Sequence, residues 1–274
     1  MEFVFLSFAN KSWYGGKPLI RLRKEVNDLG VFDKIILKDE DFFEQDYLTK
    51  YSERFKERGY GYWQWKPYLI RETLKKMNEN DILFYCDAGC HLNKNGLQRL
   101  LEYKKIVENK SGILVSDTAL DERNWTKGDL FAFFGLDIET YTGSQYQSGI
   151  VFLRNCEMSR SFVNDWYHIL HENHELSTDG VSKSSNYKSF VENRHDQSVL
   201  SLLLHTKYKC DSFSAGETWP TRGDYSQLWN YPIWACRNHV REALWMAKRK
   251  RVRHGLKRLI NKSFVYFKLL KNKL

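Results

Sequence analysis

The regular alternation of short apolar runs with longer amphipathic stretches limits this chain to one class of fold. Five runs have the length and composition of buried β-strands: residues 2–9 (EFVFLSFA), 32–37, 81–89 (DILFYCDAG), 112–117 (GILVSD) and 147–155 (QSGIVFLRN). Helical patterns follow them at 18–29, 67–78, 97–108, 129–134, 156–173 and 196–207. This order predicts an α/β fold in which a mostly parallel central sheet is covered by helices on both faces.

Such sheets bind ligands beyond the carboxyl ends of their strands. We therefore expect the chemistry to lie just after Ala9, Tyr85 and Ser116, where three of the predicted strands end. The glycine-rich loop of a dinucleotide-binding domain does not follow the first strand, and no phosphate-binding GxxxxGK[ST] motif occurs in the sequence. The pattern does not indicate either of those classes.

The end of the third strand carries a carboxylate, Asp87, followed by Ala88 and Gly89. A carboxylate at this position can ligate a divalent cation that also holds a diphosphate, and a glycine lets a bulky ligand approach the backbone. The alternative is that Asp87 caps the turn or helix that follows.

Two further groups of polar residues stand beside predicted elements. His195, Asp196 and Gln197 precede an amphipathic helix, where a carboxylate and an amide could bind sugar hydroxyls, or Asp196 could be the helix N-cap. Gln147 and Ser148 precede Gly149 at the start of a buried strand, and this glycine could also serve close packing.

These motifs, in this order, resemble those of a known family. YCDAGCHLN is similar to the strand-end DxD segment of GT-A-fold glycosyltransferases that build bacterial capsule or lipopolysaccharide. YQSGIVFLRN resembles the strand that borders their acceptor pocket. HDQSVLSLL resembles the Asp-Gln helix start of retaining families related to glycogenin and the yeast galactosyl/mannosyltransferases. GYGYWQWKPYLI (59–70) resembles a segment of uncharacterised polysaccharide transferases. The resemblance covers about residues 1–236, which we expect to form the catalytic domain.

The resemblance implies transfer of a sugar from a nucleotide donor, such as UDP-galactose or UDP-glucose, to a hydroxyl of a growing surface glycan, with retention of configuration favoured. It implies catalytic roles for Asp87, Asp196 and Gln197. The implied donor-binding residues are Ser7, Phe8, Ala9, Asn10, Trp65, Lys66, Asp87, Ala88, Gly89 and Arg194. The implied substrate-binding residues on the acceptor side are Gln147, Ser148, Gly149, His195 and Asp196.

Metal binding is the point at which the sequence departs from the family. The usual motif has two carboxylates, whereas Tyr85 and Gly89 occupy the positions two residues before and after Asp87. Mn²⁺ or Mg²⁺ could still bind Asp87 with help from elsewhere, or the enzyme could work without metal. A late histidine often completes the metal site of this fold, and His239 is the candidate here.

The formal net charge of +9 is concentrated at one end of the chain. Residues 237–274 contain thirteen Lys or Arg and one acid, with apolar residues at helical spacing from Leu244 onward. This pattern predicts a basic amphipathic helical tail whose residues 241–274 bind an anionic membrane surface, which suits a lipid-linked glycan acceptor. Packing of the apolar stripe on the domain and RNA binding are the alternatives.

Several features bear on location and on competing classes of function. The sequence lacks a signal-peptide pattern and an apolar stretch of about 18 residues, and its five cysteines are widely spaced. We expect free thiols and a cytoplasmic protein, peripheral on the inner face of the cytoplasmic membrane. A non-catalytic nucleic-acid- or glycan-binding protein is the rival class. Nucleic acid is disfavoured because the body outside the tail is nearly neutral.

Overall fold

The computed structural model describes residues 1–11, 16–220 and 225–236. The strands are β1 (Phe3–Phe8), β2 (Lys34–Lys38), β3 (Ile82–Cys86), β4 (His91–Leu92), β5 (Ile113–Asp121), β6 (Ser144–Arg154), β7 (Asp211–Ser214) and β8 (Ile233–Trp234). The α-helices are α2 (Lys17–Leu29), α3 (Gln45–Lys50), α4 (Arg58–Tyr62), α5 (Trp65–Leu74), α6 (Leu97–Asn109), α7 (Gly128–Phe133), α8 (Glu157–Glu172) and α9 (Asp196–Thr206). His239 and the basic tail lie outside the described residues.

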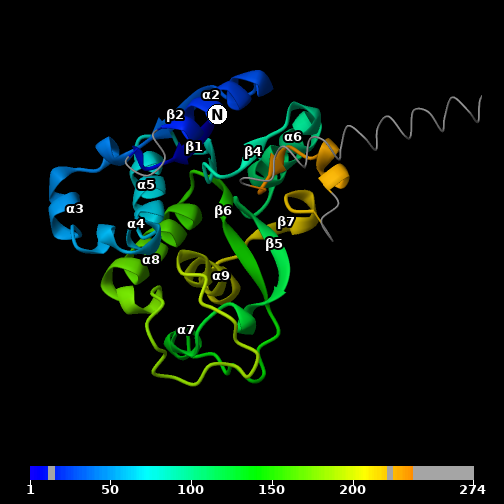
Figure 1. Cartoon of the computed structure of the whole chain (residues 1–274). Coiled ribbons are helices and arrows are strands. Elements are labelled where there is room, and N and C mark those ends of the chain that lie inside the picture. The colour runs from blue at the N-terminus through cyan, green and yellow to red at the C-terminus, as the bar shows by residue number, and fades with distance from the viewer. Residues whose placement is uncertain (12–15, 221–224, 237–274) are drawn as a thin grey trace, which may run out of the picture.

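A six-stranded sheet forms the centre of the molecule, in the order β2-β1-β3-β6-β5-β7 (Figure 1). The pairs β1–β2, β1–β3 and β5–β7 are parallel, whereas β6 runs antiparallel to both of its neighbours. The predicted mostly parallel sheet is confirmed. The run at 147–155 is indeed a strand, but it begins three residues earlier, at Ser144, and runs against the others.

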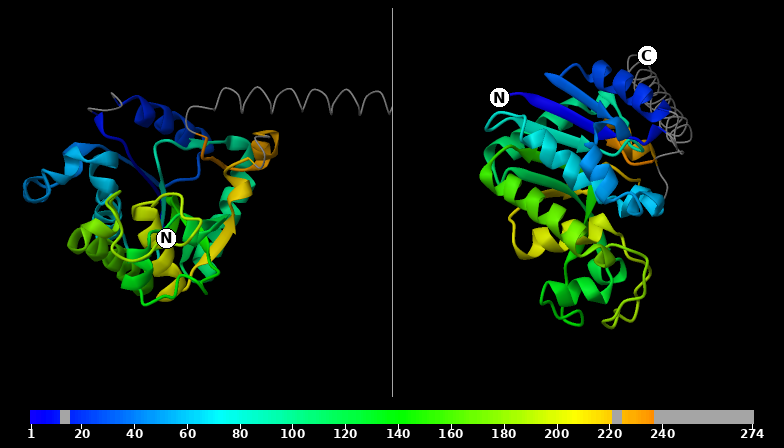
Figure 2. Two further views of the ribbon diagram at one scale, coloured as in Figure 1. Left: turned by 60° about the horizontal axis from the view of Figure 1, so that its bottom comes forward. Right: turned by 90° about the vertical axis from the view of Figure 1, so that its left-hand side faces the viewer.

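Alternate side chains of β1 show how the sheet is buried on both faces. Phe3 and Phe5 pack with residues of α2 and α6, while Val4, Leu6 and Phe8 pack with residues of α5, α8 and α9. Successive side chains of a strand point to opposite faces, so an unbroken apolar run is the expected signature of such a strand. Figure 2 shows the helices on the two sides of the sheet.

The predicted helices all occur, with small shifts at their ends. Gly30 adopts the left-handed conformation and caps α2, its N–H donating to the Val26 carbonyl, as expected. Helix α5 begins at Trp65, two residues before the proline that we expected near its start. Strands β4, β7 and β8 were not predicted. β4 and β8 have only two residues each, and β7 has four, which is too few to show a clear pattern. All five cysteines are free thiols, as expected.

The backbone of residues 59–63 is left-handed throughout. Gly59, Tyr60, Gly61, Tyr62 and Trp63 have φ values of 64°, 60°, 85°, 48° and 60°. A left-handed conformation costs a non-glycine residue about 1–2 kcal/mol, so three of the five residues store strain. Two contacts hold the turn: the indole N–H of Trp65 donates to the Gly59 carbonyl at 3.1 Å, and the Trp63 ring packs over the Cα of Gly59.

We predict that Gly59→Ala destabilises the protein more than Gly135→Ala does. Both glycines have positive φ, but a Cβ on Gly135 meets nothing within 4 Å, whereas one on Gly59 would lie 2.6 Å from the Trp63 ring. The Gly135 variant should lose about 1–2 kcal/mol from backbone strain, and the Gly59 variant about 1–3 kcal/mol more from displacement of the indole. Urea unfolding measures both. Equal losses would show that the Trp63 contact does not hold the turn.

Candidate active site

A pocket of 540 Å³ opens at the carboxyl ends of β1 and β3. It is lined by residues from the end of β1 (Phe8, Ala9, Asn10), the first turns of α2 (Lys17, Pro18, Arg21), the left-handed turn and α5 (Gly59, Tyr60, Trp63, Trp65) and the loop after β3 (Asp87, Ala88, Gly89, His91). This is the edge of the sheet at which the sequence predicted the chemistry.

Asp87 lies where the pocket meets a buried cluster of charges. Its backbone N–H donates to the Gly149 carbonyl at 2.9 Å, and its Oδ1 accepts from the Tyr85 hydroxyl at 2.6 Å. The Lys66 amine lies 3.4 Å from the same oxygen. A Cβ on Gly149 would approach Oδ2 to 2.7 Å, so this glycine makes room for the carboxylate. The Asp87 side chain is 32% exposed and therefore reaches the pocket.

Lys66 is the cation at the centre of this cluster, and only 1% of it is exposed. Its Nζ lies 2.8 Å from Asp196 Oδ2 and 3.0 Å from the Ser148 hydroxyl, in addition to the contact with Asp87. Burial alone would lower the pKa of the ammonium, but the charges of Asp196 and Asp87 raise it above its ordinary value. Lys66 therefore stays charged between the two acids. Burial still raises the pKa of Asp196 above its ordinary value, and the charge of Lys66 limits that rise.

Asp196 reaches Lys66 from the start of α9. His195 occupies the N-cap position, and no side chain caps the helix, so the alternative that Asp196 is the N-cap is wrong. His195 has φ 58° and ψ −123°, an unfavourable conformation for a residue with a side chain. It is held there by a hydrogen bond from Nδ1 to the Ser177 carbonyl at 2.7 Å and by stacking on Trp63.

Gln197, Ser148 and Gly149 complete the region that the sequence singled out. The N–H of Ser148 donates to Gln197 Oε1 at 3.3 Å, and Gln197 Nε2 donates to Gln145 Oε1 at 2.6 Å. Ser148 also contacts Lys66, so the start of β6 joins the Asp196 side of the cluster to the Asp87 side. Gln147 lies between Tyr146 and Ser148 on β6 and is partly exposed.

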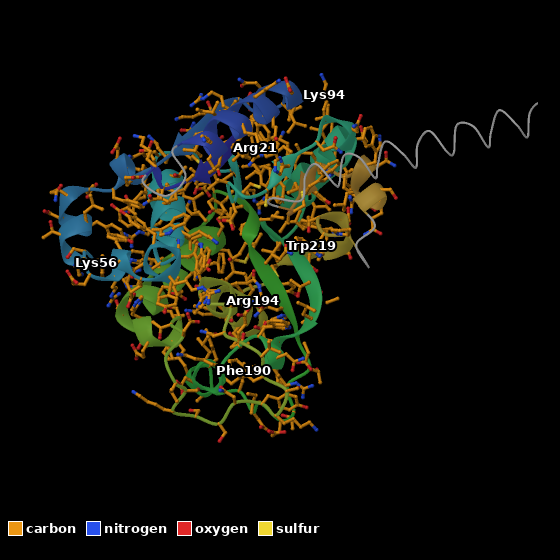
Figure 3. All side chains as sticks on the ribbon, viewed as in Figure 1. Arg21, Lys56, Lys94, Phe190, Arg194 and Trp219 are labelled. Carbon is orange, nitrogen blue, oxygen red and sulfur yellow. The ribbon has the colours of Figure 1, made fainter. Side chains whose placement is uncertain are left out.

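The structure brings most of the predicted residues to one edge of the sheet. Phe8, Ala9, Asn10, Trp65, Asp87, Ala88 and Gly89 line the pocket. Three predicted donor-binding residues lie elsewhere. Ser7 is buried and donates to the Cys86 carbonyl at 2.6 Å, and Lys66 lies inside the charge cluster. The Arg194 guanidinium stacks on Trp125, well below Arg21 (Figure 3).

Sequence reasoning missed the contribution of α2. Lys17, Pro18 and Arg21 line the pocket, and Arg21 donates to the Ala88 carbonyl at 2.6 Å and lies 3.0 Å from His91 Nδ1. The order of strands and helices could have indicated this contribution. In an α/β fold the helix after a strand begins at the same edge at which the strand ends, so its first turns face the ligand site.

The described residues do not form a complete metal site. Asp87 is the single carboxylate that lines the pocket, and the part of the chain that the structure describes contains no group of three His, Cys, Asp or Glu side chains arranged to hold a metal ion. His91 Nδ1 is engaged by Glu25 at 3.0 Å and by Arg21. Asp87 could therefore contribute one ligand, and the others would have to come from elsewhere.

Comparison with solved structures identifies the fold. It is similar to a glycosyltransferase involved in the glycosylation of the major capsid of PBCV-1, at 8% identity and a TM-score of 0.51 over 90% of this chain and 100% of that one. Mouse xyloside xylosyltransferase 1 is 12% identical, with a TM-score of 0.46 over 85% of this chain and 84% of that one. Core-mannan synthase A from Aspergillus fumigatus is 9% identical, with a TM-score of 0.41 over 78% of this chain and 73% of that one. Both TM-scores are too low to support a further conclusion. The chain thus has the GT-A-like α/β fold that the sequence predicted.

Neither sequence comparison adds a relative. No family model matches the chain, and no curated protein is similar to it. Within the described residues, no helix is long and apolar enough to cross a bilayer.

We predict that Lys66→Met lowers the free energy of unfolding at pH 7 by about 3–5 kcal/mol, because it leaves the buried Asp196 carboxylate without a counter-charge. The double variant Lys66→Met/Asp196→Asn removes both charges and should recover part of the loss. Chemical denaturation of the wild type and the single and double variants measures this. A Lys66 variant as stable as the wild type would contradict the charge-balancing role.

Proposed function

We propose that the protein is a glycosyltransferase that moves a sugar from a nucleotide-sugar donor to a hydroxyl of a glycan. One observation carries the proposal: in a GT-A fold, a pocket opens at the carboxyl ends of β1 and β3 with the Asp87 carboxylate at its inner side. The pocket is bordered by cationic side chains and aromatic rings, the groups that suit a diphosphate and a base or sugar ring.

The donor is oriented by the two halves of this pocket. We place the base and ribose against Phe8, Ala9 and Asn10, and the diphosphate toward Gly89 and the first turns of α2. Lys17 and Arg21 supply positive charge there, and the N-terminus of a helix favours an anion. A UDP-hexose, such as UDP-galactose or UDP-glucose, is the proposed donor.

In the reaction, the bond between the anomeric carbon and the diphosphate oxygen breaks, and a bond from the acceptor hydroxyl oxygen to that carbon forms. The hydroxyl proton leaves with the departing diphosphate or passes to a carboxylate. Negative charge grows on the diphosphate as the sugar approaches an oxocarbenium ion. Lys17 and Arg21 stabilise that charge. We propose that Asp196 and Gln197 face the sugar and that configuration is retained, on the strength of the Asp-Gln motif.

The acceptor is proposed to be a growing surface glycan or lipid-linked glycan, of the kind made in capsule, lipopolysaccharide or O-antigen synthesis. Gln147, Ser148 and His195 are the proposed acceptor-side residues. Gln147 is partly exposed, whereas Ser148 and His195 are buried. If the enzyme uses Mn²⁺ or Mg²⁺, Asp87 is the ligand that the described residues supply, and His239 is the proposed second one.

The first test is a thermal shift with nucleotides at millimolar concentration. Bound ligand stabilises the folded state in proportion to the logarithm of its concentration over Kd, so the correct nucleoside diphosphate should raise Tm by a few degrees. UDP, GDP and CMP, each with and without Mn²⁺, separate the donor class from metal dependence. No shift with any of them would favour the rival class, a non-catalytic glycan- or nucleic-acid-binding protein.

The second test is sugar transfer by Asp87→Asn and Asp196→Asn. Each substitution keeps the shape of the side chain but removes a charge that balances Lys66, so transfer should fall at least about 100-fold. Circular dichroism of each variant checks that the fold is intact. Wild-type turnover in both variants would refute these site assignments.

We also propose that residues 241–274 attach the protein to an anionic membrane on the cytoplasmic side. Each Lys or Arg near such a surface contributes on the order of 1 kcal/mol, and the attachment should weaken with salt. Sedimentation with liposomes containing an anionic lipid compares the full chain with a chain ending at residue 240. Equal pelleting of the two would refute the proposal.

A further inference from the structure

Glu122 is a fully buried acid next to the candidate site, immediately after β5. Its Oε1 accepts from the hydroxyl of Thr126 and, at 3.0 Å, from Gln145 Nε2; its Oε2 accepts from the hydroxyl of Ser201 on α9. The described residues place no Lys, Arg or His within ion-pair distance of it. A buried carboxyl without a counter-charge is costly, so its presence needs a reason other than stability.

Gln145, one of the hydrogen-bond partners of Glu122, is also hydrogen-bonded to Gln197. Gln145 Nε2 is surrounded by oxygen atoms: Glu122 Oε1, the Trp125 carbonyl at 3.2 Å, and the hydroxyls of Thr126 and Ser198. A nitrogen is required at that end of the amide, so Gln145 must turn its Oε1 toward Gln197.

The orientation of Gln197 follows from that of Gln145. Gln197 must present its Nε2 to Gln145 Oε1, at 2.6 Å, and its own Oε1 then accepts from the Ser148 N–H at 3.3 Å. Both amides are thus held in one of their two possible orientations. Gln197 is partly exposed, whereas Gln145 and Glu122 are fully buried, so the chain of bonds runs from the interior outward to the site.

We infer that Glu122 and Gln145 are positioning residues for sugar transfer, which fix the direction in which the Gln197 amide faces the sugar. The inference rests on the proposed function for its catalytic consequence. Glu122, Gln145 and Gln197 all lie outside the lining of the 540 Å³ pocket, and the two buried residues act on the partly exposed Gln197.

The protonation state of Glu122 suits this role. Burial raises the pKa of this carboxyl to about 7, and hydrogen bonds from Ser201, Thr126 and Gln145 limit the rise. Two other titratable groups interact with it through charge: Asp121, whose charge adds to the effect of burial, and the Tyr141 phenol. Below pH 7 the acid is neutral. With its proton on Oε2, toward Ser201, Oε1 remains the acceptor of the Gln145 amide, and above pH 7 both oxygens accept.

The first experiment needs no enzymatic activity. In the full chain labelled with ¹⁵N-glutamine, Gln145→Leu and Gln197→Leu assign the two side-chain amides. We expect both signals to move between pH 5.5 and 8.5 with one apparent pKa near 7, because the Glu122 charge strengthens the bond from Gln145. The shift should vanish in Glu122→Gln. If the Gln197 amide is unaffected by both pH and Glu122→Gln, the coupling does not exist.

The second experiment is a double-mutant cycle on transfer. Gln145→Leu should lower kcat about tenfold or more and change the donor KM little, a loss typical of residues that orient a functional group. In the Gln197→Leu background it should have no further effect. Additive losses would overturn the inference, because Gln145 would then act independently of Gln197.

Asn155→Ala is the matched control. Asn155 is a buried amide just beyond the other end of β6, and its Nδ2 donates to main-chain carbonyls such as those of Leu74 and Met77. It should lower Tm without moving kcat or the two amide signals, and an equal fall in kcat would assign the Gln145 effect to general destabilisation. A wild type that transfers no sugar would refute the proposed function and the catalytic role together. The amide coupling would still be seen in that case, which tells the two failures apart.

Discussion

The buried ammonium of Lys66 is the interaction on which the rest of the site depends. It lies between Asp87, at the end of β3, and Asp196, at the start of α9, and it also contacts Ser148 on β6. Two carboxylates so close together repel each other, and the ammonium between them offsets that repulsion. A single side chain therefore joins both acids and fixes three elements of the sheet and its helices relative to one another.

Backbone strain is concentrated around this charge cluster. The left-handed turn at 59–63 leads into the helix that carries Lys66, and His195, with its unfavourable φ and ψ, directly precedes Asp196. The Trp63 ring stacks on His195, so the two strained segments support each other. Strain of this kind persists only where surrounding contacts enforce it. Here those contacts position the two backbone segments that carry Lys66 and Asp196, so that the two side chains meet.

Local patterns predicted the fold well, because each element leaves its own periodicity in the sequence. They also indicated Asp87, Gly149 and Asp196, because a carboxylate or glycine at the end of a predicted strand or helix can be recognised from the sequence alone. They did not predict that Lys66 turns inward: a helix start fixes where a lysine lies along the chain, but its rotation depends on carboxylates far away in sequence. Arg21 and Glu122 were missed for a similar reason. Neither belongs to a motif, and their roles depend on contacts with residues distant in sequence: Ala88 after β3 for Arg21, and Gln145 on β6 for Glu122.

The place of β6 in the sheet has a consequence for how the chain must fold. It separates β3 from β5 and pairs with both, so β5 and β7 join the sheet only through it. Until residues 144–154 have been synthesised and inserted, β3 has one edge of unpaired backbone N–H and C=O groups, the kind of edge that recruits strands from other chains. We therefore expect the first half of the molecule not to form the complete sheet on its own. The edge that carries Asp87 and the core beside it are completed only when β6 is in place.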